Sequence, residues 1–208
     1  MLGQIEWIFF DVGSTLADES EAYAHRIRDA ISGTNIPYQE FWDRMIGFYR
    51  QNKKGDLETL RYYGLDVPKW HKEDEKLYPD AEECLKRLKG TYKIGVIANQ
   101  SPGTKERLEA FGILKYIDLV IASAEEGVSK PDLRIFKIAL ERAGCSPENA
   151  AMVGDRLDND IIPANALGMA SIWIKQGFSR YGEPKTEAEQ PDYTVNSLTE
   201  ICELFRQS

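Results

Sequence analysis

The feature that most constrains the fold of this chain is a repeated alternation of short apolar stretches with segments of helical period. The first apolar stretch ends at Phe10, and four more follow at residues 92–98, 118–122, 150–153 and 170–174. Apolar strands separated by amphipathic helices pair in parallel through right-handed crossovers, and their helices cover both faces of the sheet. The sequence therefore predicts an α/β fold with a doubly wound, Rossmann-like parallel sheet.

Local signals predict where several helices of the core begin. The signals are side chains that commonly cap helix N-termini, in some cases with a partnering acid or proline. They are Asp80 with Glu83, Ser101 with Pro102, Asp132, and Ser197 with Glu200. The segment 175–190, which is rich in Gly, Pro and charge, is predicted to be a surface loop.

Residues 19–76 interrupt the alternation with a purely helical pattern. Four apolar side chains in this region fall on one face of a 3.6-residue period, namely those of Phe41, Met45, Phe48 and Tyr49. No alternating run of any length accompanies them. We expect a small all-helical cap domain of residues 19–77, inserted into a core domain of residues 1–18 and 78–208.

The insert holds several aromatic side chains and both histidines. Its aromatics, including Tyr23, Trp42, Tyr62 and Tyr63, either pack inside the insert or line a ligand pocket. Packing is the better-supported interpretation, because a helical stripe usually forms the core of its own bundle. His25 and His71 have no partner motif, so we expect surface or packing roles for them.

Composition excludes several classes of protein. The chain has 208 residues and a net charge of −8, which gives no broad positive field for a nucleic-acid backbone. The first apolar segment is too short to span a bilayer and lacks the basic region of a secretion signal, so we expect a cytoplasmic protein without a membrane partner. Oligomeric state is left open. Cys84, Cys145 and Cys202 are isolated and odd in number, which predicts buried reduced thiols rather than disulfides or a zinc site.

Polar side chains follow the ends of the predicted strands. In an open parallel sheet, ligands bind beyond these carboxyl ends. The residues are Asp11, Asn99, Lys130 and Asp155, with Asp158 and Asp160 shortly after. Converging carboxylates repel one another unless a cation lies among them. Oxygen donors without His or Cys suit a hard ion, so the sequence predicts bound Mg²⁺.

Each of these elements also has an ordinary structural interpretation. Asp11 is suited to a turn or a helix cap, Ser129 to Asp132 to a helix start, and the acids of VGDRLDND to a helix N-terminus. Their conjunction in chain order at strand ends favours a functional site. Behind Asp11, the run Gly13-Ser14-Thr15 is expected to turn backbone N–H groups toward an anion.

These motifs resemble those of the haloacid dehalogenase superfamily of hydrolases, in the branch with a helical cap inserted after the first motif. FFDVGSTL is similar to its first motif, IAN to the second, VSKPD to the third and VGDRLDNDIIPANALGM to the fourth. The resemblance covers essentially the whole chain. It implies a Rossmann-like core, a helical cap and a magnesium-dependent hydrolase.

The resemblance also implies roles for individual residues. Asp11 corresponds to the nucleophile that attacks phosphorus and forms an aspartyl-phosphate, and Lys130 to the lysine of the third motif. Asp155 and Asp160 correspond to the acids that hold Mg²⁺, together with Asp11 and the backbone carbonyl of Gly13. The substrate is then a small phosphorylated metabolite.

Two positions depart from the family pattern. Phosphatases of the family usually carry an acid–base aspartate two residues after the nucleophile, where this chain has Gly13. The second motif usually offers a hydroxyl to the phosphate, where this chain has Ala98 followed by Asn99. Because a positioned acid–base contributes about 10²–10⁴-fold, we expect slower turnover of poor leaving groups. Ser14 and Thr15 are candidates for partial compensation.

These departures leave three hypotheses. The first is a phosphatase-like hydrolase with a weakened acid–base position. The second is a catalytically weak relative that binds phosphate as a sensor or protein partner. The third, ranked lower, is dehalogenation or phosphonate cleavage, the latter through a Schiff base on a lysine of the insert. The candidate lysines are Lys53, Lys54, Lys69, Lys72 and Lys76.

Overall fold

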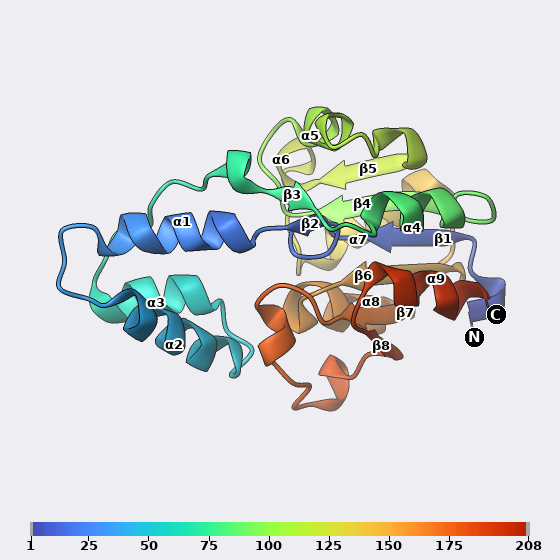
Figure 1. Cartoon of the computed structure of the whole chain (residues 1–208). Helices are drawn as coiled ribbons and strands as arrows, with labels where there is room; N and C mark the ends of the chain where they lie inside the picture. The colour runs from blue at the N-terminus through green and yellow to red at the C-terminus, as the bar shows by residue number, and fades with distance from the viewer. Residues whose placement is uncertain (1, 207–208) are drawn as a thin grey trace.

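A parallel six-stranded sheet forms the centre of the computed structural model, which describes residues 2–206 (Figure 1). The strand order is β5-β4-β1-β6-β7-β8, and every neighbouring pair is parallel. The strands are β1 (Trp7–Phe10), β4 (Lys93–Ala98), β5 (Leu119–Ala122), β6 (Ala150–Gly154), β7 (Ala170–Ile174) and β8 (Tyr193–Val195). The predicted α/β fold is confirmed. Sequence reasoning missed β8, whose three residues include an exposed Thr194 and carry no clear apolar run.

The register of the central strands aligns their carboxyl ends. Phe10, the last residue of β1, lies opposite Val96 of β4 and Val153 of β6. The residues that follow these strands therefore emerge at one edge of the sheet. This edge faces the helical insert (Figure 1).

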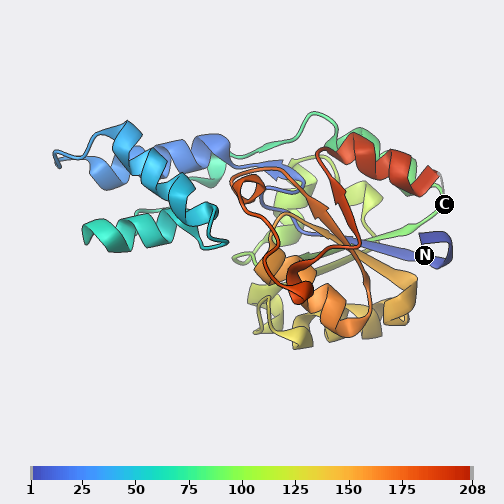
Figure 2. The ribbon, with the colours of Figure 1, turned by 90° about the horizontal axis from the view of Figure 1, so that it is seen from below.

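Helices cover both faces of the sheet (Figure 2). Ile8 and Phe10 point into one apolar cluster with α4 (Ala81–Leu88), α5 (Thr104–Ala110) and α9 (Leu198–Arg206), whereas Phe9 points into another with α7 (Leu133–Ala143) and α8 (Ile162–Leu167). Alternation of side chains along β1 thus builds two buried layers. In residues 2–206, no helix has the length and apolar character needed to cross a membrane.

Two of the predicted helix caps form as expected. The side chain of Asp132 accepts a hydrogen bond from Arg134 N at 2.9 Å and caps α7. Ser197 Oγ accepts from Glu200 N at 3.2 Å at the start of α9. The Glu200 carboxylate accepts in turn from Asn196 N at 2.8 Å.

Asp80 occupies the predicted N-cap position of α4 without capping the helix through its side chain, and the prediction for Ser101 and Pro102 was wrong. The Asp80 side chain does not cap α4, because it accepts hydrogen bonds from Thr199 N and Oγ1 at 2.9 and 3.0 Å and so ties α4 to α9. Helix α5 begins at Thr104 after Gly103, so Ser101 and Pro102 precede it. A contact distant in sequence thus displaced the local cap at Asp80.

The insert forms a helical body of α1 (Ser20–Ile31), α2 (Tyr38–Tyr49) and α3 (Gly55–Tyr63), beside the core (Figure 1). A short antiparallel ribbon of β2 (Ala17–Asp18) and β3 (Lys76–Leu77) joins it to the core. We propose the division predicted from sequence, with residues 19–77 as cap and residues 1–18 and 78–208 as core.

The sequence pattern predicted helical structure throughout the insert, but the helices end at Tyr63. Gly64 ends α3 in the left-handed region at φ 64°, and residues 65–71 are irregular. A short turn, η2 (Lys72–Asp74), then leads into β3. The return of the chain to the core is therefore an extended segment that runs past α1.

Segment 175–190 is not the simple surface loop that was predicted. Phe178 is buried in it, and its ring packs against Tyr23, Trp42 and Tyr49 of the insert, with ring centroids 4.8–5.5 Å apart. Phe178, a residue of the core domain, therefore completes the apolar cluster at the centre of the cap. Trp42 is confirmed as a packing residue, whereas Tyr62 is exposed.

The cysteines agree with the prediction in part. Cys84 and Cys202 are buried and unlinked, and the thiol of Cys202 lies 3.7 Å from the carbonyl oxygen of Cys84. Cys145 is also unlinked but only half-buried, so the prediction of burial was wrong for this residue.

Candidate active site

Three carboxylates meet at the carboxyl edge of the sheet. Asp11 directly follows β1, where its N–H donates to Val153 O at 2.9 Å. Asp155 directly follows β6, and Trp173 of β7 fixes its carbonyl through a 2.7 Å hydrogen bond. Asp160 lies in η5 (Leu157–Ile161) and is fully buried. One carboxylate oxygen from each of the three aspartates lies within 4.8 Å of the others, as the sequence predicted.

Lys130 lies among these acids. Its Nζ is 2.9 Å from Asp11 Oδ1 and 2.6 Å from Asp160 Oδ1, and its side chain is 1% exposed. Asn99 fixes the main chain of Lys130 from both sides, since its Nδ2 donates to Lys130 O at 2.9 Å and its Oδ1 accepts from Lys130 N at 2.8 Å. The side-chain amide of Asn99 thereby positions the lysine.

Close approach of the main chain permits the burial of Asp160. A Cβ atom on Gly154 would lie 2.3 Å from the Asp160 carboxyl group, so only glycine leaves room for it. One Asp160 oxygen accepts from Lys130 Nζ and the other from Arg156 N at 3.1 Å. Both oxygens are thus engaged within the protein.

The electrostatics of the cluster show an excess of negative charge. Burial raises the pKa of Asp155 well above its usual value, and the neighbouring Asp160 and Asp11 raise it further. Burial likewise raises the pKa of Asp160 to about 6, against the lowering effect of Lys130. Burial lowers the pKa of Lys130, but Asp11 and Asp160 outweigh it, so that this pKa is raised. One cation therefore faces three acids, and the oxygen donor set fits a hard divalent ion.

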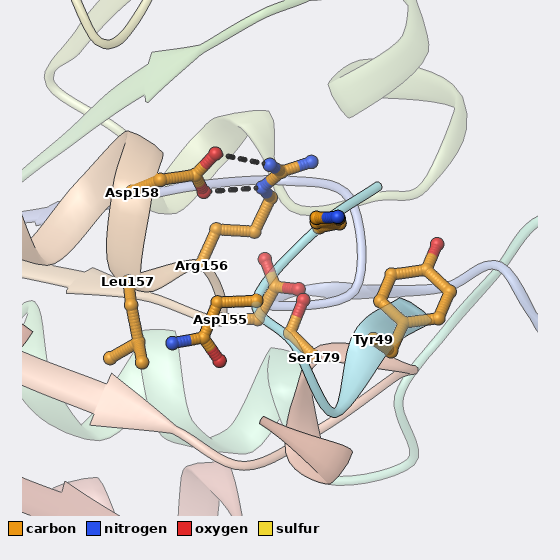
Figure 3. Close-up of a pocket in the computed structure, with 8 residues that line it drawn as sticks. Tyr49, Asp155, Arg156, Leu157, Asp158 and Ser179 are labelled. Atoms are coloured by element: carbon orange, nitrogen blue, oxygen red, sulfur yellow. Dashed lines mark hydrogen bonds and ion pairs between the residues drawn. The ribbon is translucent and has the colours of Figure 1, made fainter. Parts of the chain in front are cut away.

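A cavity of about 150 Å³ opens between this cluster and the cap. Asp11, Lys130 and Asp155 line it from the core, and Tyr23, Tyr49 and Lys54 line it from the cap. Among the residues that line it, Asp155 and the hydroxyl group of Ser179 point toward one another, and Arg156 turns away to pair with Asp158 (Figure 3). Asp158 thus balances Arg156 and lies outside the group of three acids.

A family model decides the relationship of this chain to known proteins. Residues 5–168 match the haloacid dehalogenase-like hydrolase family. The chain belongs to this family. The family resemblance predicted from the motifs is therefore confirmed, and so is an enzyme of the hydrolase class.

Curated relatives in the haloacid dehalogenase family extend over nearly the whole chain. A glyceraldehyde 3-phosphate phosphatase of Methanocaldococcus jannaschii is 31% identical and spans 97% of this chain and 97% of its own length. The corresponding enzyme of Methanopyrus kandleri is 35% identical over 98% of both chains. A pyrimidine 5'-nucleotidase, YjjG of Escherichia coli, is 36% identical over 96% of this chain and 97% of its own.

Solved structures of the family share the fold. A putative haloacid dehalogenase-type hydrolase, YfnB of Bacillus subtilis, whose crystals hold magnesium, matches with a TM-score of 0.71 at 20% identity, over 97% of this chain and 98% of its own. A predicted phosphoglycolate phosphatase of Haemophilus somnus matches with a TM-score of 0.72 at 20% identity, over 98% and 99% of the two chains.

The turn after the family's nucleophile position differs from the sequence-based expectation. Ser14 N donates to Ala17 O at 2.8 Å and Thr15 N to Val12 O at 3.3 Å, so these two N–H groups do not face an anion. Thr15 is fully buried, whereas Ser14 lines the cavity. The turn satisfies its own main chain because it leads at once into the ribbon to the cap.

Sequence reasoning missed Glu19, which lies between β2 and α1 and lines the cavity. A Cβ atom on Gly13 would lie 2.6 Å from Glu19 Oε1, and Ser14 Oγ donates to Glu19 Oε2 at 2.9 Å. Burial raises the pKa of Glu19 to about 8, against the hydrogen bond from Ser14, and Glu75 and Asp11 add to the rise. In the sequence, Glu19 is one of several acids near the start of the insert, and no local signal singles it out.

Proposed function

We propose that this protein is a magnesium-dependent phosphatase that hydrolyses a small phosphorylated metabolite through an aspartyl-phosphate on Asp11. The observation that carries the proposal is the placement of Lys130 Nζ between Asp11 and Asp160, at the floor of a cavity that the cap covers. A buried lysine held by two carboxylates orients the nucleophile and supplies a fixed positive charge for a phosphoryl group.

The residues of the cluster divide the chemistry. An Asp11 oxygen attacks phosphorus, its bond to phosphorus forms, and the bond from phosphorus to the leaving oxygen breaks. Water then attacks the aspartyl-phosphate, which releases phosphate and restores Asp11. Mg²⁺ would be held by Asp11, Asp155, Asp160 and the Gly13 carbonyl, and it would neutralise charge on the phosphoryl oxygens.

Glu19 is the group that we assign to proton transfer. The departing alkoxide needs a proton, and the attacking water must lose one. Gly13 has no side chain to exchange them, but the Glu19 carboxyl group fills the space beside it and faces the same cavity. In this proposal Glu19 supplies the acid–base group that is missing at Gly13, whose absence motivated the hypothesis of a catalytically weak sensor.

The comparisons support the substrate class. Curated relatives over nearly the full length are named for glyceraldehyde 3-phosphate and pyrimidine 5'-nucleotides, which are small phosphate monoesters. A cavity of about 150 Å³, with Lys54 and tyrosines on its cap side, suits a small polar molecule. The net charge of −8 is consistent with the expectation of no nucleic-acid partner.

Phosphate release from a panel of small phosphate monoesters, with and without Mg²⁺, tests this function. We expect release that needs Mg²⁺ and that falls by about 10³-fold or more in Asp11→Asn. Asp43→Asn, which changes an exposed acid of the cap, is the matched control and should retain full activity. Release by Asp11→Asn at the rate of the unaltered protein would refute the proposed nucleophile.

One observation keeps phosphonate cleavage as a second candidate. Of the five lysines considered from the sequence, Lys54 lines the cavity that also holds Asp11, where an amine is able to meet a substrate carbonyl. Borohydride reduction in the presence of an aldehyde-bearing phosphonate would trap a Schiff base on Lys54. A mass increase that disappears in Lys54→Ala would favour phosphonate cleavage over ester hydrolysis.

A further inference from the structure

A second cavity, of about 450 Å³, adjoins the cavity beside Lys130. The two cavities share Glu19, Tyr23 and Lys54 among their lining residues, so a molecule bound at Lys130 is able to extend from one into the other. The adjoining cavity lies between the cap and the loop that follows β4, which contributes Ser101. The chemistry proposed above uses only the first cavity.

Two of the acids that line the adjoining cavity are already paired with a cation. Arg26 Nη1 lies 2.7 Å from Oδ2 of the buried Asp56. The buried Glu75 pairs with Arg107 and also accepts a hydrogen bond from Trp70 Nε1 at 2.6 Å. Each of these ion pairs is neutral as a unit.

Two lysines that line the same cavity are not neutralised in this way. The side chains of Lys54 and Lys72 are both exposed. Lys72 Nζ donates to Ser101 Oγ, which is a neutral partner. Within residues 2–206, the ammonium group of Lys54 forms no hydrogen bond or ion pair. The remaining acid of the lining is Glu19, the residue that we assign to proton transfer.

The adjoining cavity therefore has a local excess of positive charge. Arg156 also lines it but adds no net charge, because it pairs with Asp158. Two lysines thus face one acid, although the whole chain has a net charge of −8. A cleft that is lined by charges of one sign attracts ligands of the opposite sign. A lysine ammonium group is a compact point charge on a flexible stem, which suits an anion.

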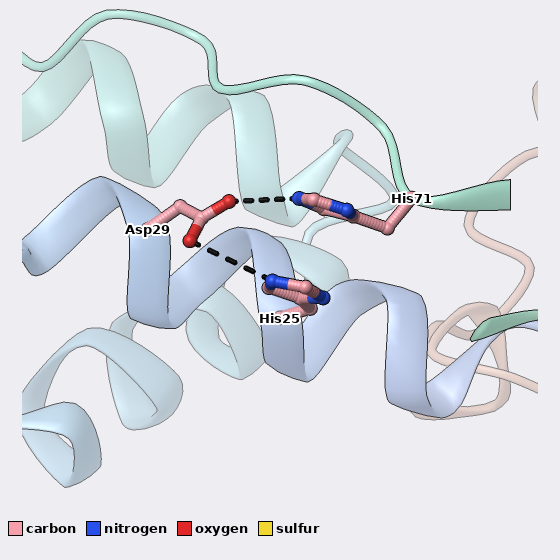
Figure 4. A group of neighbouring side chains, drawn as sticks. All are labelled: His25, Asp29 and His71. Atoms are coloured by element: carbon pink, nitrogen blue, oxygen red, sulfur yellow. Dashed lines mark hydrogen bonds and ion pairs between the residues drawn. The ribbon is translucent and has the colours of Figure 1, made fainter. Parts of the chain in front are cut away.

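The segment that carries Lys72 is fixed to the cap by the neighbouring His71. The ring of His71 stacks on that of His25 with centroids 3.5 Å apart, and its Nε2 lies 2.8 Å from Asp29 Oδ2 (Figure 4). The two histidines thus have the packing role that the sequence predicted. Because these contacts hold the return segment on α1, they also hold the wall of the cavity to which Trp70 and Lys72 belong.

Apolar surface accompanies the charges in the adjoining cavity. Tyr23, Leu57 and Trp70 line it, and the rings of Tyr23 and Trp70 meet edge-on with centroids 4.9 Å apart. Apolar and aromatic walls with a few polar groups are typical of sites for small organic molecules. The lining therefore suits a carbon chain that has the phosphoryl group at one end and a second charge at the other.

We propose that the substrate carries a second anionic group, a carboxylate or a phosphate, on the part that leaves, and that Lys54 and Lys72 bind this group in the adjoining cavity. The inference rests on the proposed function, because the phosphoryl group must occupy the cavity beside Lys130. It narrows the substrate class from small phosphate monoesters in general to monoesters of an alcohol that is itself anionic.

A matched series of phosphonates tests the proposal without any turnover. Butylphosphonate, 4-phosphonobutyrate and butane-1,4-diphosphonate have carbon chains of the same length and cannot be hydrolysed as esters. Calorimetric titration of the full chain at saturating Mg²⁺ measures the Kd of each. We expect at least one of the two ligands with a second anionic group to bind about tenfold or more tightly than butylphosphonate. The tighter of these two identifies the group as a carboxylate or a phosphate.

Lysine variants show whether this preference comes from the adjoining cavity. Lys72→Gln should lower the ratio of the two Kd values by about threefold, and Lys54→Gln combined with Lys72→Gln should abolish the preference. The matched control is Lys69→Gln, which removes an equal charge from an exposed position of the same segment outside the lining and should retain the full preference.

Equal affinity for all members of the series, no binding of the two ligands with a second anionic group, or a preference that survives the double variant would overturn the proposal. These outcomes are distinct from failure of the proposed function. Preferred binding of the anionic ligands, with no phosphate release from any monoester, would refute the phosphatase alone. Phosphate release together with equal affinities would refute the second anionic group alone.

Discussion

The carboxyl group of Glu19 occupies the space beside Gly13 into which a side chain would otherwise project. A Cβ atom on Gly13 would lie 2.6 Å from Glu19 Oε1 and 2.9 Å from both Cδ and Oε2 of the same residue. The position of the Glu19 carboxyl group therefore depends on the absence of a side chain at Gly13. Glu19, an acid at the start of the cap, therefore lies beside the proposed nucleophile Asp11, where phosphatases of the family usually place an aspartate of their first motif.

Glu19→Gln tests the proton-transfer role. The amide preserves the shape of the side chain but cannot give up a proton, so kcat/KM should fall by about 10²–10⁴-fold on alkyl phosphates, whose leaving groups need protonation. The kcat/KM for p-nitrophenyl phosphate should fall much less, because its leaving group departs as a stable anion and the later attack of water does not enter kcat/KM. Steady-state kinetics on both substrates measures the difference.

The matched control for this variant is Glu21→Gln, on an exposed acid in the first turn of α1, which should leave both values of kcat/KM unchanged. Equal losses of kcat/KM on alkyl and aryl substrates would instead indicate that Glu19 only supports the local structure.

Gly13→Asp should not raise phosphatase activity while Glu19 is present. The new side chain would collide with the Glu19 carboxyl group, so we expect lower stability and lower turnover from this single change. Combined with Glu19→Ala, the same aspartate gains the vacated space and should recover at least about tenfold over Glu19→Ala alone. Kinetics and thermal unfolding of the three variants form a double-mutant cycle, and additive effects would contradict the shared space.

Lys130→Met should strongly destabilise the fold. It leaves the carboxylates of Asp11 and Asp160 without their cation, and removal of one partner from a buried ion pair costs about 3–5 kcal/mol. Urea denaturation without Mg²⁺ measures the free energy of unfolding. Adding Asp160→Asn to Lys130→Met should recover part of the loss, because one fewer charge is then unpaired. A double variant less stable than the single one would contradict this account.

The stability that His71 contributes to the fold should depend on pH. Hydrogen bonds to Asp29 and then to Glu73 raise the pKa of His71 above its ordinary value of 6.5. His25, Asp74 and Lys69 also surround this part of the cap. The stability contributed by His71 is therefore fully present below the unfolded pKa of about 6.5 and is lost as pH rises through the folded pKa.

Denaturation of the unaltered protein and of His71→Ala at about pH 6 and about pH 8 measures this trend. The stability difference between these two proteins should shrink at the higher pH. A difference that stays the same at both values would contradict a raised pKa of His71 in the folded protein.

The sequence by itself determined five of the six strands of the sheet and the acids around Lys130. Apolar runs separated by helical periods leave few ways to cover a parallel sheet, and the residue after each central strand must emerge at the carboxyl edge. Asp11 and Asp155 were therefore placed by local pattern alone, and the position of Lys130 followed from the same edge. The cap on α7 was likewise local, because Asp132 bonds only two residues ahead.

Only the tertiary structure decided the contacts that join distant segments. Glu19 beside Gly13, Phe178 in the apolar centre of the cap, and His71 against His25 depend on how the insert folds over the core and on where each side chain points. Periodicity gives the buried face of one element but not its partner across a loop. The return segment after Gly64 has no period at all, so its packing on α1, and the histidine pair that this packing creates, appear only in three dimensions.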